Sequence, residues 1–190
     1  MSRWEPNSRR RLQEAALELY AEQGFAETSV AEVAERAGLT ERTFFRYFPD
    51  KREVLFDGEG HFRELLVGAV SEVPASATPM EAIKAGFDAL AAELQPIRDR
   101  ARKRSRIIAA YPELQERELV KLASWSAAFE DALRGRGLTE SAAKVAGEVA
   151  VAVFHAAFQL WTDDGRKKDL AELVSEALVD LRALVESTPA

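Results

Sequence analysis

The amino-acid sequence predicts an all-α fold of about nine helices, and three observations support this. Ala, Leu, Glu and Arg, which favour helices, dominate the composition. Apolar residues do not alternate with the period of two that is typical of a half-buried strand. Glycine and proline fall between the amphipathic stretches, where helices end and begin. A hydrophobic content of 47% over 190 residues can form a core without metal or disulfide support.

Three of these helices are expected in the first 50 residues, over residues 8–23, 30–37 and 41–47. The first carries apolar side chains on one face, at helical spacing, and Gly24 ends it because glycine readily adopts the left-handed cap conformation. Ser29 and Glu32 form a capping box that opens the second helix. Gly38 separates the second helix from the third.

The later helices are expected over residues 51–72, from residue 79, from residue 96, over 112–135, over 139–162 and over 168–186. Asp50 with Glu53 predicts a capping box that opens the long fourth helix. Residues 73–79 form the clearest loop, and Pro79 occupies the first helical position of the fifth helix. Proline likewise opens the sixth and seventh helices.

The composition excludes several kinds of site. The chain has no cysteine, which argues against a disulfide framework, a thiolate zinc site and a cysteine nucleophile. The two histidines show no metal-ligand spacing, so we expect neither a metal nor a cofactor. The N-terminus lacks the apolar run of a signal peptide, and the apolar stretch 149–161 is shorter than a bilayer requires. A soluble, cytoplasmic protein without a membrane partner is therefore expected.

The net charge of −6 does not argue against nucleic acid, because only the face that approaches phosphate must be basic. Residues 1–52 contain nine basic and nine acidic side chains. The whole acidic excess therefore lies beyond them.

Residues 30–47 have the layout of a helix-turn-helix, which is two short helices joined by a glycine-containing turn. Ala34 is small where the two helices would cross, and Gly38 stands where the turn needs a positive φ. The apolar seam beneath them is expected from Val30, Val33, Leu39, Phe44 and Phe48. This spacing is also found in other helical proteins, so it is a moderate signal alone.

The run from Thr28 to Leu55, TSVAEVAERAGLTERTFFRYFPDKREVL, closely resembles the signature of the TetR family, as does the preceding helix that ends in Gly24-Phe25. The resemblance implies a DNA-binding transcriptional regulator, most often a homodimeric repressor that a small molecule releases from a near-palindromic operator. It implies a helix-turn-helix DNA-binding domain over residues 1–50. A helical bundle for ligand binding and dimerisation would follow over residues 51–190.

By the same resemblance the third helix lies in the DNA major groove. Its expected contacts to bases or backbone are Thr40, Arg42, Thr43 and Arg46, and the expected phosphate contacts are Ser29, Tyr47 and Lys51. Arg42 stands where the family often has a small residue, which suggests base reading peculiar to this chain. Phe45 replaces a more usual tyrosine, so we expect no phosphate contact there. From the charges alone, a solvated helix face would be the simpler interpretation.

The last two helices are the expected dimer interface, because the eighth is apolar almost all round and the ninth carries one apolar stripe. The expected interface residues are Ala146, Ala150, Val153, Trp161, Val174, Leu178 and Leu181. The alternative is the core of a monomer.

A ligand site is expected among the aromatic side chains of the second domain. The candidates are Phe62, Phe87, Trp125, Phe129 and Phe158, with His155 as the polar member. Core packing is the simpler role for each aromatic residue, and a satisfied core or interface histidine is the simpler role for His155.

The stretch from Arg102 through Ile107-Ile108 to Pro112-Glu113-Leu114 resembles mycofactocin-regulator-like members of the family, which implies an acyl-CoA-like inducer. For the basic run 98–106 a solvated helix face is the favoured interpretation, and a further DNA contact or a clamp for an anionic ligand are the alternatives.

Other classes of function are weaker. The sequence has no glycine-rich phosphate loop and no Gly-x-Ser-x-Gly, which argues against an enzyme. A helical protein-interaction module without DNA binding is one alternative, and a TetR-type activator is another. The expected partners are an operator in double-stranded DNA, a second copy of the chain and a small-molecule inducer.

Overall fold

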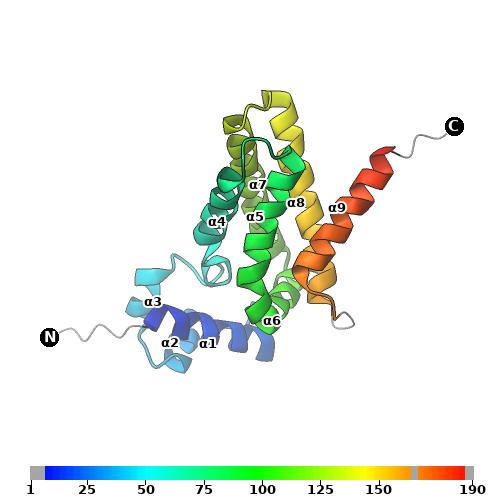
Figure 1. The fold of residues 1–190 in the computed structure, drawn as a ribbon. Coiled ribbons are helices and arrows are strands. Elements are labelled where there is room, and N and C mark those ends of the chain that lie inside the picture. Colours follow the sequence, from blue (N-terminus) through cyan, green and yellow to red (C-terminus); the bar gives the residue numbers. More distant parts are fainter. Residues whose placement is uncertain (1–6, 164–166, 187–190) are drawn as a thin grey trace. The chain divides into compact units, whose positions relative to one another are not determined.

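The computed structural model describes residues 7–163 and 167–186, and within them the chain is helical with no strand (Figure 1). The α-helices of this part are α1 Ser8–Glu22, α2 Val30–Arg36, α3 Glu41–Tyr47, α4 Glu59–Glu72, α5 Pro79–Leu94, α6 Arg98–Ala110, α7 Pro112–Gly135, α8 Glu140–Thr162 and α9 Leu170–Glu186. Two short 3₁₀ helices cover Glu53–Phe56 and Gln95–Ile97. The predicted all-α fold of about nine helices is confirmed.

The predicted fourth helix is wrong at its start. Instead of one helix over residues 51–72, the chain forms a 3₁₀ turn at Glu53–Phe56 and begins α4 only at Glu59. Gly58 lies between them with a φ of +92°, a left-handed conformation that interrupts a right-handed helix. Asp50 still accepts the backbone N–H of Glu53, at 3.2 Å, so half of the expected capping box forms and caps the 3₁₀ turn.

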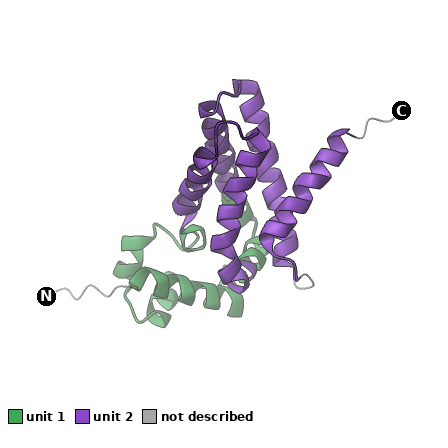
Figure 2. Ribbon diagram, in the orientation of Figure 1, with its two compact units in different colours: residues 1–57, 103–118 green, residues 58–102, 119–190 purple. Residues whose placement is uncertain are grey.

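The chain divides into two compact units (Figure 2). Unit 1 comprises residues 1–57 and 103–118, and unit 2 comprises residues 58–102 and 119–190. The two units are defined by which residues contact one another, and not by function. The boundary expected between a DNA-binding domain and a ligand-binding domain, at residues 50 and 51, therefore stays a prediction.

Unit 1 is built around the three N-terminal helices. Phe44 and Phe48, at 0% and 2% exposure, lie in its core, and Val33 and Ala34 are buried where α2 crosses its neighbours. The second chain segment of the unit adds three buried side chains to the same core, which are Ile107, Ile108 and Leu114.

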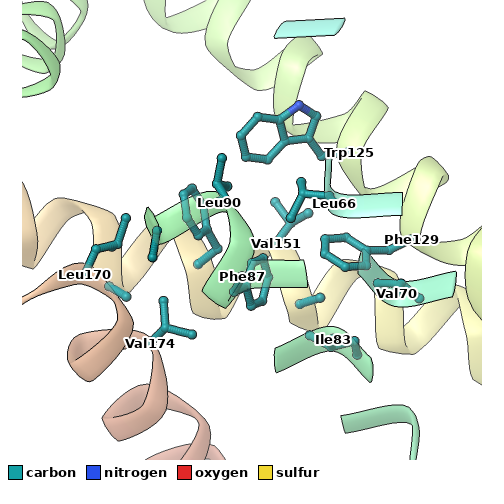
Figure 3. Close-up of a cluster of buried hydrophobic side chains, with 14 of the residues drawn as sticks. Leu66, Val70, Ile83, Phe87, Leu90, Trp125, Phe129, Val151, Leu170 and Val174 are labelled. Carbon is teal, nitrogen blue, oxygen red and sulfur yellow. The ribbon is translucent and has the colours of Figure 1, made fainter. Parts of the chain in front are cut away.

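Unit 2 has a separate core between α4, α5, α7, α8 and α9 (Figure 3). Phe87, Phe129 and Trp161 are among its largest fully buried side chains. The helices approach closely at Gly147, where an added Cβ would lie 2.6 Å from the carbonyl oxygen of Ser126. The absence of a side chain at Gly147 therefore allows α8 to lie close to α7.

Helix α8 is longer than the apolar stretch recognised in the sequence. Its 23 residues have a mean hydropathy of 1.3 in the most apolar window, which is long and apolar enough to cross a membrane. In this structure its apolar side chains contribute to the core of unit 2. A core helix meets the same criteria of length and composition, so the feature is weak evidence for a membrane span.

Candidate functional site

The helix-turn-helix begins with a capping box at the N-terminus of α2. Ser29 Oγ accepts the backbone N–H of Glu32 at 3.2 Å, and Glu32 Oε2 accepts that of Ser29 at 2.8 Å. Bonds from the Ser29 backbone and hydroxyl and from the Gln23 amide hold the pKa of the Glu32 carboxyl below its usual value, because they favour the ionised form. The capping box predicted for α2 is thus confirmed.

The turn after α2 is a Schellman motif. The N–H of Leu39 donates to the carbonyl of Ala34 and that of Gly38 to the carbonyl of Glu35, both at 2.8 Å. Gly38 has a φ of +65°, and an added Cβ would lie 2.7 Å from Arg11 Nη2. Glycine therefore sets the angle at which α3 leaves the turn.

Helix α3 has one buried side and one exposed side. Thr40 caps it by accepting the N–H of Thr43 at 3.2 Å, and Phe44 anchors it in the core. Thr40, Arg42 and Arg46 are exposed and Thr43 is half-buried, so the structure brings the four expected base-contacting residues onto one short helix. Phe45 is also on the surface, 54% exposed, a large apolar side chain among polar ones.

The two α3 arginines differ in their surroundings. Within the described part of the chain Arg42 makes no hydrogen bond or ion pair. Arg46 folds back on its neighbour: Nη2 donates to the Tyr47 hydroxyl at 3.0 Å, and Cζ lies 4.8 Å from the centre of the Tyr47 ring. Both side chains are exposed, so Arg46 can exchange this contact for one to DNA.

Lys51 was expected to bind phosphate, and its environment points to a different role. Its Nζ donates to the carbonyl oxygens of Phe25, Ala26 and Thr28 at 2.8, 3.1 and 2.9 Å. It also lies 4.5 Å from the centre of the Phe25 ring. An ammonium group has three donors, and all three are used here. Lys51 therefore holds the loop between α1 and α2 in place.

Most other cations of α1 and α2 are paired within unit 1. Arg36 bonds Glu22 at 2.9 Å, and Arg10 lies 3.2 Å from Glu14. Arg9 donates through Nε to Asp57 at 2.8 Å. The pairings of Arg36 and Arg9 join residues 14 and 48 positions apart and could not be read from the sequence, whereas Arg10 and Glu14 are four residues apart on one helix. They leave the two α3 arginines as the clearest candidates for contact with DNA.

The expected ligand residues fall into two groups. Phe87, Trp125 and Phe129 are buried in the unit 2 core, and Phe62 and Phe158 are partly buried against it. These five aromatic residues therefore belong to one cluster. His155 lies outside it, half-buried on α8, with its Nε2 3.3 Å from the Gln159 side-chain nitrogen.

The aromatic core is continuous. Phe87 lies 5.3 Å from both Phe129 and Phe154 between ring centres, and Phe154 lies 5.7 Å from Phe158. Phe158 in turn lies 5.5 Å from Trp161. Phe154 joins the candidate rings together.

The expected dimer residues lie mostly inside the chain. Ala150, Trp161 and Val174 are at most 1% exposed in the core of unit 2, and Val153 is 7% exposed. Ala146 and Leu178 are partly buried against that core, and Leu181 is half-buried.

The exposed apolar side chains of the same two helices are different residues, which are Val145 and Leu160 on α8 and Val179, Leu184 and Val185 on α9. They were missed because α8 was taken as apolar almost all round, although Lys144, Glu148 and Gln159 share one exposed face of the helix.

The basic run in α6 is mostly engaged within each unit. Arg98 donates to the carbonyl oxygen of Trp161 at 3.0 and 2.8 Å in unit 2. Arg104 donates to the Leu55 carbonyl at 2.5 Å and to Glu118 at 2.7 Å in unit 1. These two arginines are structural and belong neither to a solvated face nor to an anion clamp.

Comparison with known proteins agrees with this architecture. The family model for bacterial regulatory proteins of the tetR family matches residues 12–57, and the MftR C-terminal domain matches residues 77–186, more than half of the chain. A Mycobacterium tuberculosis protein named MftR, described as a mycofactocin biosynthesis transcriptional regulator, is 30% identical over 114 residues. That alignment covers 60% of this chain and 58% of the relative, so the chain spans less than two thirds of it.

Two solved structures show the shared fold. Thermus thermophilus FadR, a TetR-family repressor in complex with lauroyl-CoA, has a TM-score of 0.60 and 24% identity and covers 96% of this chain and 98% of its own. Bacillus subtilis FadR with stearoyl-CoA has a TM-score of 0.65 and 20% identity, covering 94% and 98%. Together, the family matches and the helix-turn-helix show that this chain belongs to the TetR family of DNA-binding transcriptional regulators, with a C-terminal domain of the MftR type, and is not an enzyme.

Proposed function

We propose that the chain is a homodimeric repressor that binds a near-palindromic operator and is released by a small hydrophobic or acyl-type ligand. The observation that carries the DNA side of this proposal is the exposed face of α3, where Arg42 and Arg46 stand beside Thr40 and Thr43. An arginine can donate two hydrogen bonds to guanine O6 and N7, which discriminates by about 1–3 kcal/mol against a wrong base. Ser29 and Tyr47, at either side of this face, would fix register through phosphate.

A dimer is supported by the exposed apolar side chains of α8 and α9. Val145 is 61% exposed, Val179 67% and Leu184 75%, and such residues cost free energy when they face water. Two copies would present two α3 helices to successive major grooves, about 34–36 Å apart, and so read a near-palindrome. Ala146, Leu178 and Leu181, which are only partly buried, would border this interface.

A ligand response is supported by the aromatic core of unit 2, where rings from α5, α7 and α8 form a continuous apolar cluster. Both FadR structures above hold an acyl-CoA. A ligand that binds better to a conformation unable to hold both half-sites would shift the population away from DNA. The protein would act in the cytoplasm, where the operator is.

The test is a titration of the full chain against DNA from upstream of its own gene and against scrambled DNA, at several salt concentrations. Preferential binding to the first, with log affinity falling by about 0.9 per neutralised phosphate against log salt, supports the proposal. Absence of binding to any DNA at low salt contradicts it and favours the protein-interaction module.

A transcriptional activator would give the same binding curve. A reporter gene placed behind the operator separates the two, because a repressor lowers its expression and an activator raises it. Adding lauroyl-CoA to the DNA titration then tests release.

A further inference from the structure

The indole N–H of Trp125 is a buried donor without an acceptor. Trp125 is 3% exposed, and its Nε1 has no hydrogen-bond partner in the described part of the chain. Tryptophan N–H groups usually find a partner when buried, because an unsatisfied donor loses its bond to water and gains nothing in return. An unsatisfied donor in a domain built to sense a ligand is a reason to look for the missing acceptor in the ligand.

The second tryptophan of this core shows the normal arrangement. Trp161 is fully buried, and its Nε1 donates to Gln95 Oε1 at 3.0 Å. The same acceptor also receives the backbone N–H of Leu170 at 3.3 Å. The fold can therefore satisfy a buried indole when the indole has only a packing role. Trp125 departs from that pattern within the same unit.

The polar surroundings of Trp125 are suited to an oxygen acceptor. Lys121, one turn earlier on α7 and only 9% exposed, has its Nζ 5.1 Å from the centre of the Trp125 ring. An ammonium group is a donor and a positive charge, so it cannot accept the indole proton. The hydroxyl of Ser124 lies 2.8 Å from the carbonyl oxygen of Lys121 and 3.1 Å from Glu59 Oε1, and its single proton is shared between these two acceptors. An electron-rich oxygen brought in by a ligand would accept the indole N–H.

The apolar surroundings of Trp125 are suited to a hydrocarbon chain. Its ring lies 5.6 Å from that of Phe154, which leads to Phe158 and then to Trp161. In Figure 3 Trp125 lies at the edge of the cluster, with its nitrogen on the side turned away from Phe87. One side of the indole thus faces an aromatic row, and the other presents the donor.

We propose that the Trp125 N–H donates a hydrogen bond to the carbonyl or carboxylate oxygen of an acyl ligand, whose hydrocarbon chain lies along the aromatic row toward Trp161. This assignment rests on the proposed ligand response and gives it a specific recognition residue. The shared chemistry is an acyl oxygen on a long apolar chain, and it has two sources, a free fatty acid and an acyl thioester of coenzyme A.

The test compares the two tryptophans with one conservative replacement. β-(Benzothiophen-3-yl)alanine keeps the shape of tryptophan and replaces the N–H by sulfur. The full chain carrying it at position 125 or at position 161 is titrated with lauroyl-CoA and with dodecanoate by calorimetry. At position 125 we expect affinity for the bound probe to fall about tenfold, as for a lost hydrogen bond to a charged or strongly polar group, while the melting temperature holds or rises. At position 161 we expect the reverse, a lower melting temperature and affinity within about twofold of the original.

The two probes separate the sources, because binding of dodecanoate alone indicates the free acid and binding of lauroyl-CoA alone indicates the thioester. Unchanged affinity in the position 125 variant overturns the assignment, and so does failure of the original chain to bind either probe. Trp125→Phe provides a second variant without the N–H. Operator binding of each ligand-free variant is measured alongside, so that a failed DNA-binding proposal is recognised independently of a failed ligand assignment.

Discussion

Replacing Lys51 with methionine separates a structural role from a phosphate contact. Methionine keeps most of the apolar stem and removes the ammonium group. The carbonyls of Phe25, Ala26 and Thr28 then lose their common donor, and Phe25 loses the cation above its ring. The loop between α1 and α2 is the part of unit 1 that this change should loosen.

The magnitude follows from how exposed each contact is. Hydrogen bonds to a charged group contribute about 1.5–3 kcal/mol when well formed, and a cation above an aromatic ring at a partly exposed site contributes about 0.5–1 kcal/mol. Lys51 is half-buried, and the bond to Ala26 is exposed to water, which replaces much of it. We therefore expect the free energy of unfolding to fall by about 2 kcal/mol in all.

Urea denaturation of the DNA-free protein measures this change, and operator titrations in a salt series measure the number of phosphates contacted. If Lys51 has a structural role, Lys51→Met lowers the free energy of unfolding and leaves the slope of log affinity against log salt unchanged. If Lys51→Met unfolds with the free energy of the original protein and its salt slope is smaller by about 0.9, the structural role is refuted and a phosphate contact is supported instead. Arg42→Met is the matched control, because it removes an exposed charge from the same unit and should leave stability unchanged.

Three further changes test other parts of the structure. Arg46→Ala should weaken operator binding about tenfold in electrophoretic titrations and leave unfolding unchanged, because the side chain is exposed and its polar contact within the described residues is with the neighbouring Tyr47. Burial, and next the charge of Asp50, raise the pKa of Tyr20 above its ordinary value of 10.0. Above that pH the unfolded state releases the phenol proton more readily than the folded state, so the free energy of unfolding should fall by up to about 1.4 kcal/mol per pH unit. Tyr20→Phe should reduce this loss in urea titrations. Val179→Asp should turn dimers into monomers by light scattering, because it puts a charge into the proposed interface.

Each of these has its own contrary result. Loss of helicity in Arg46→Ala would show a structural residue where we place a reader of DNA. An unaltered alkaline slope in Tyr20→Phe would mean that this phenol does not titrate differently on unfolding. Val120→Asp, on α7 and 63% exposed, is the control for Val179→Asp, and equal loss of dimers in both would contradict an interface on α8 and α9.

The parts of the fold that depend on local chemistry could be predicted from the sequence. The Ser29–Glu32 box, the Gly38 turn and Pro79 at the start of α5 each act within a few residues, so their patterns are short and specific. The start of α4 was missed because one glycine within a helical pattern costs only about 1 kcal/mol and seldom decides alone. Gly58 decides here because it takes a left-handed φ.

The parts that depend on distant partners could not be predicted. Lys51 meets carbonyl oxygens 23 to 26 residues away, and nothing local distinguishes it from a lysine that binds phosphate. The outward side of α8, in contrast, could have been predicted, because Val153 lies opposite the face that carries Lys144, Glu148 and Gln159, whereas Val145 lies beside that face.

Unit 1 takes its core from two separate stretches of chain, and this bears on how such regulators can be recombined. Exchanging residues 1–57 alone between two relatives would pair the α1–α3 core of one protein with the Ile107, Ile108 and Leu114 of the other. Tyr111 adds a further constraint, since its hydroxyl accepts the Phe25 N–H at 3.0 Å and lies where a side chain on residue 24 would stand. A hybrid with altered operator choice therefore has to carry residues 103–118 along with the N-terminal helices, as one inherited block.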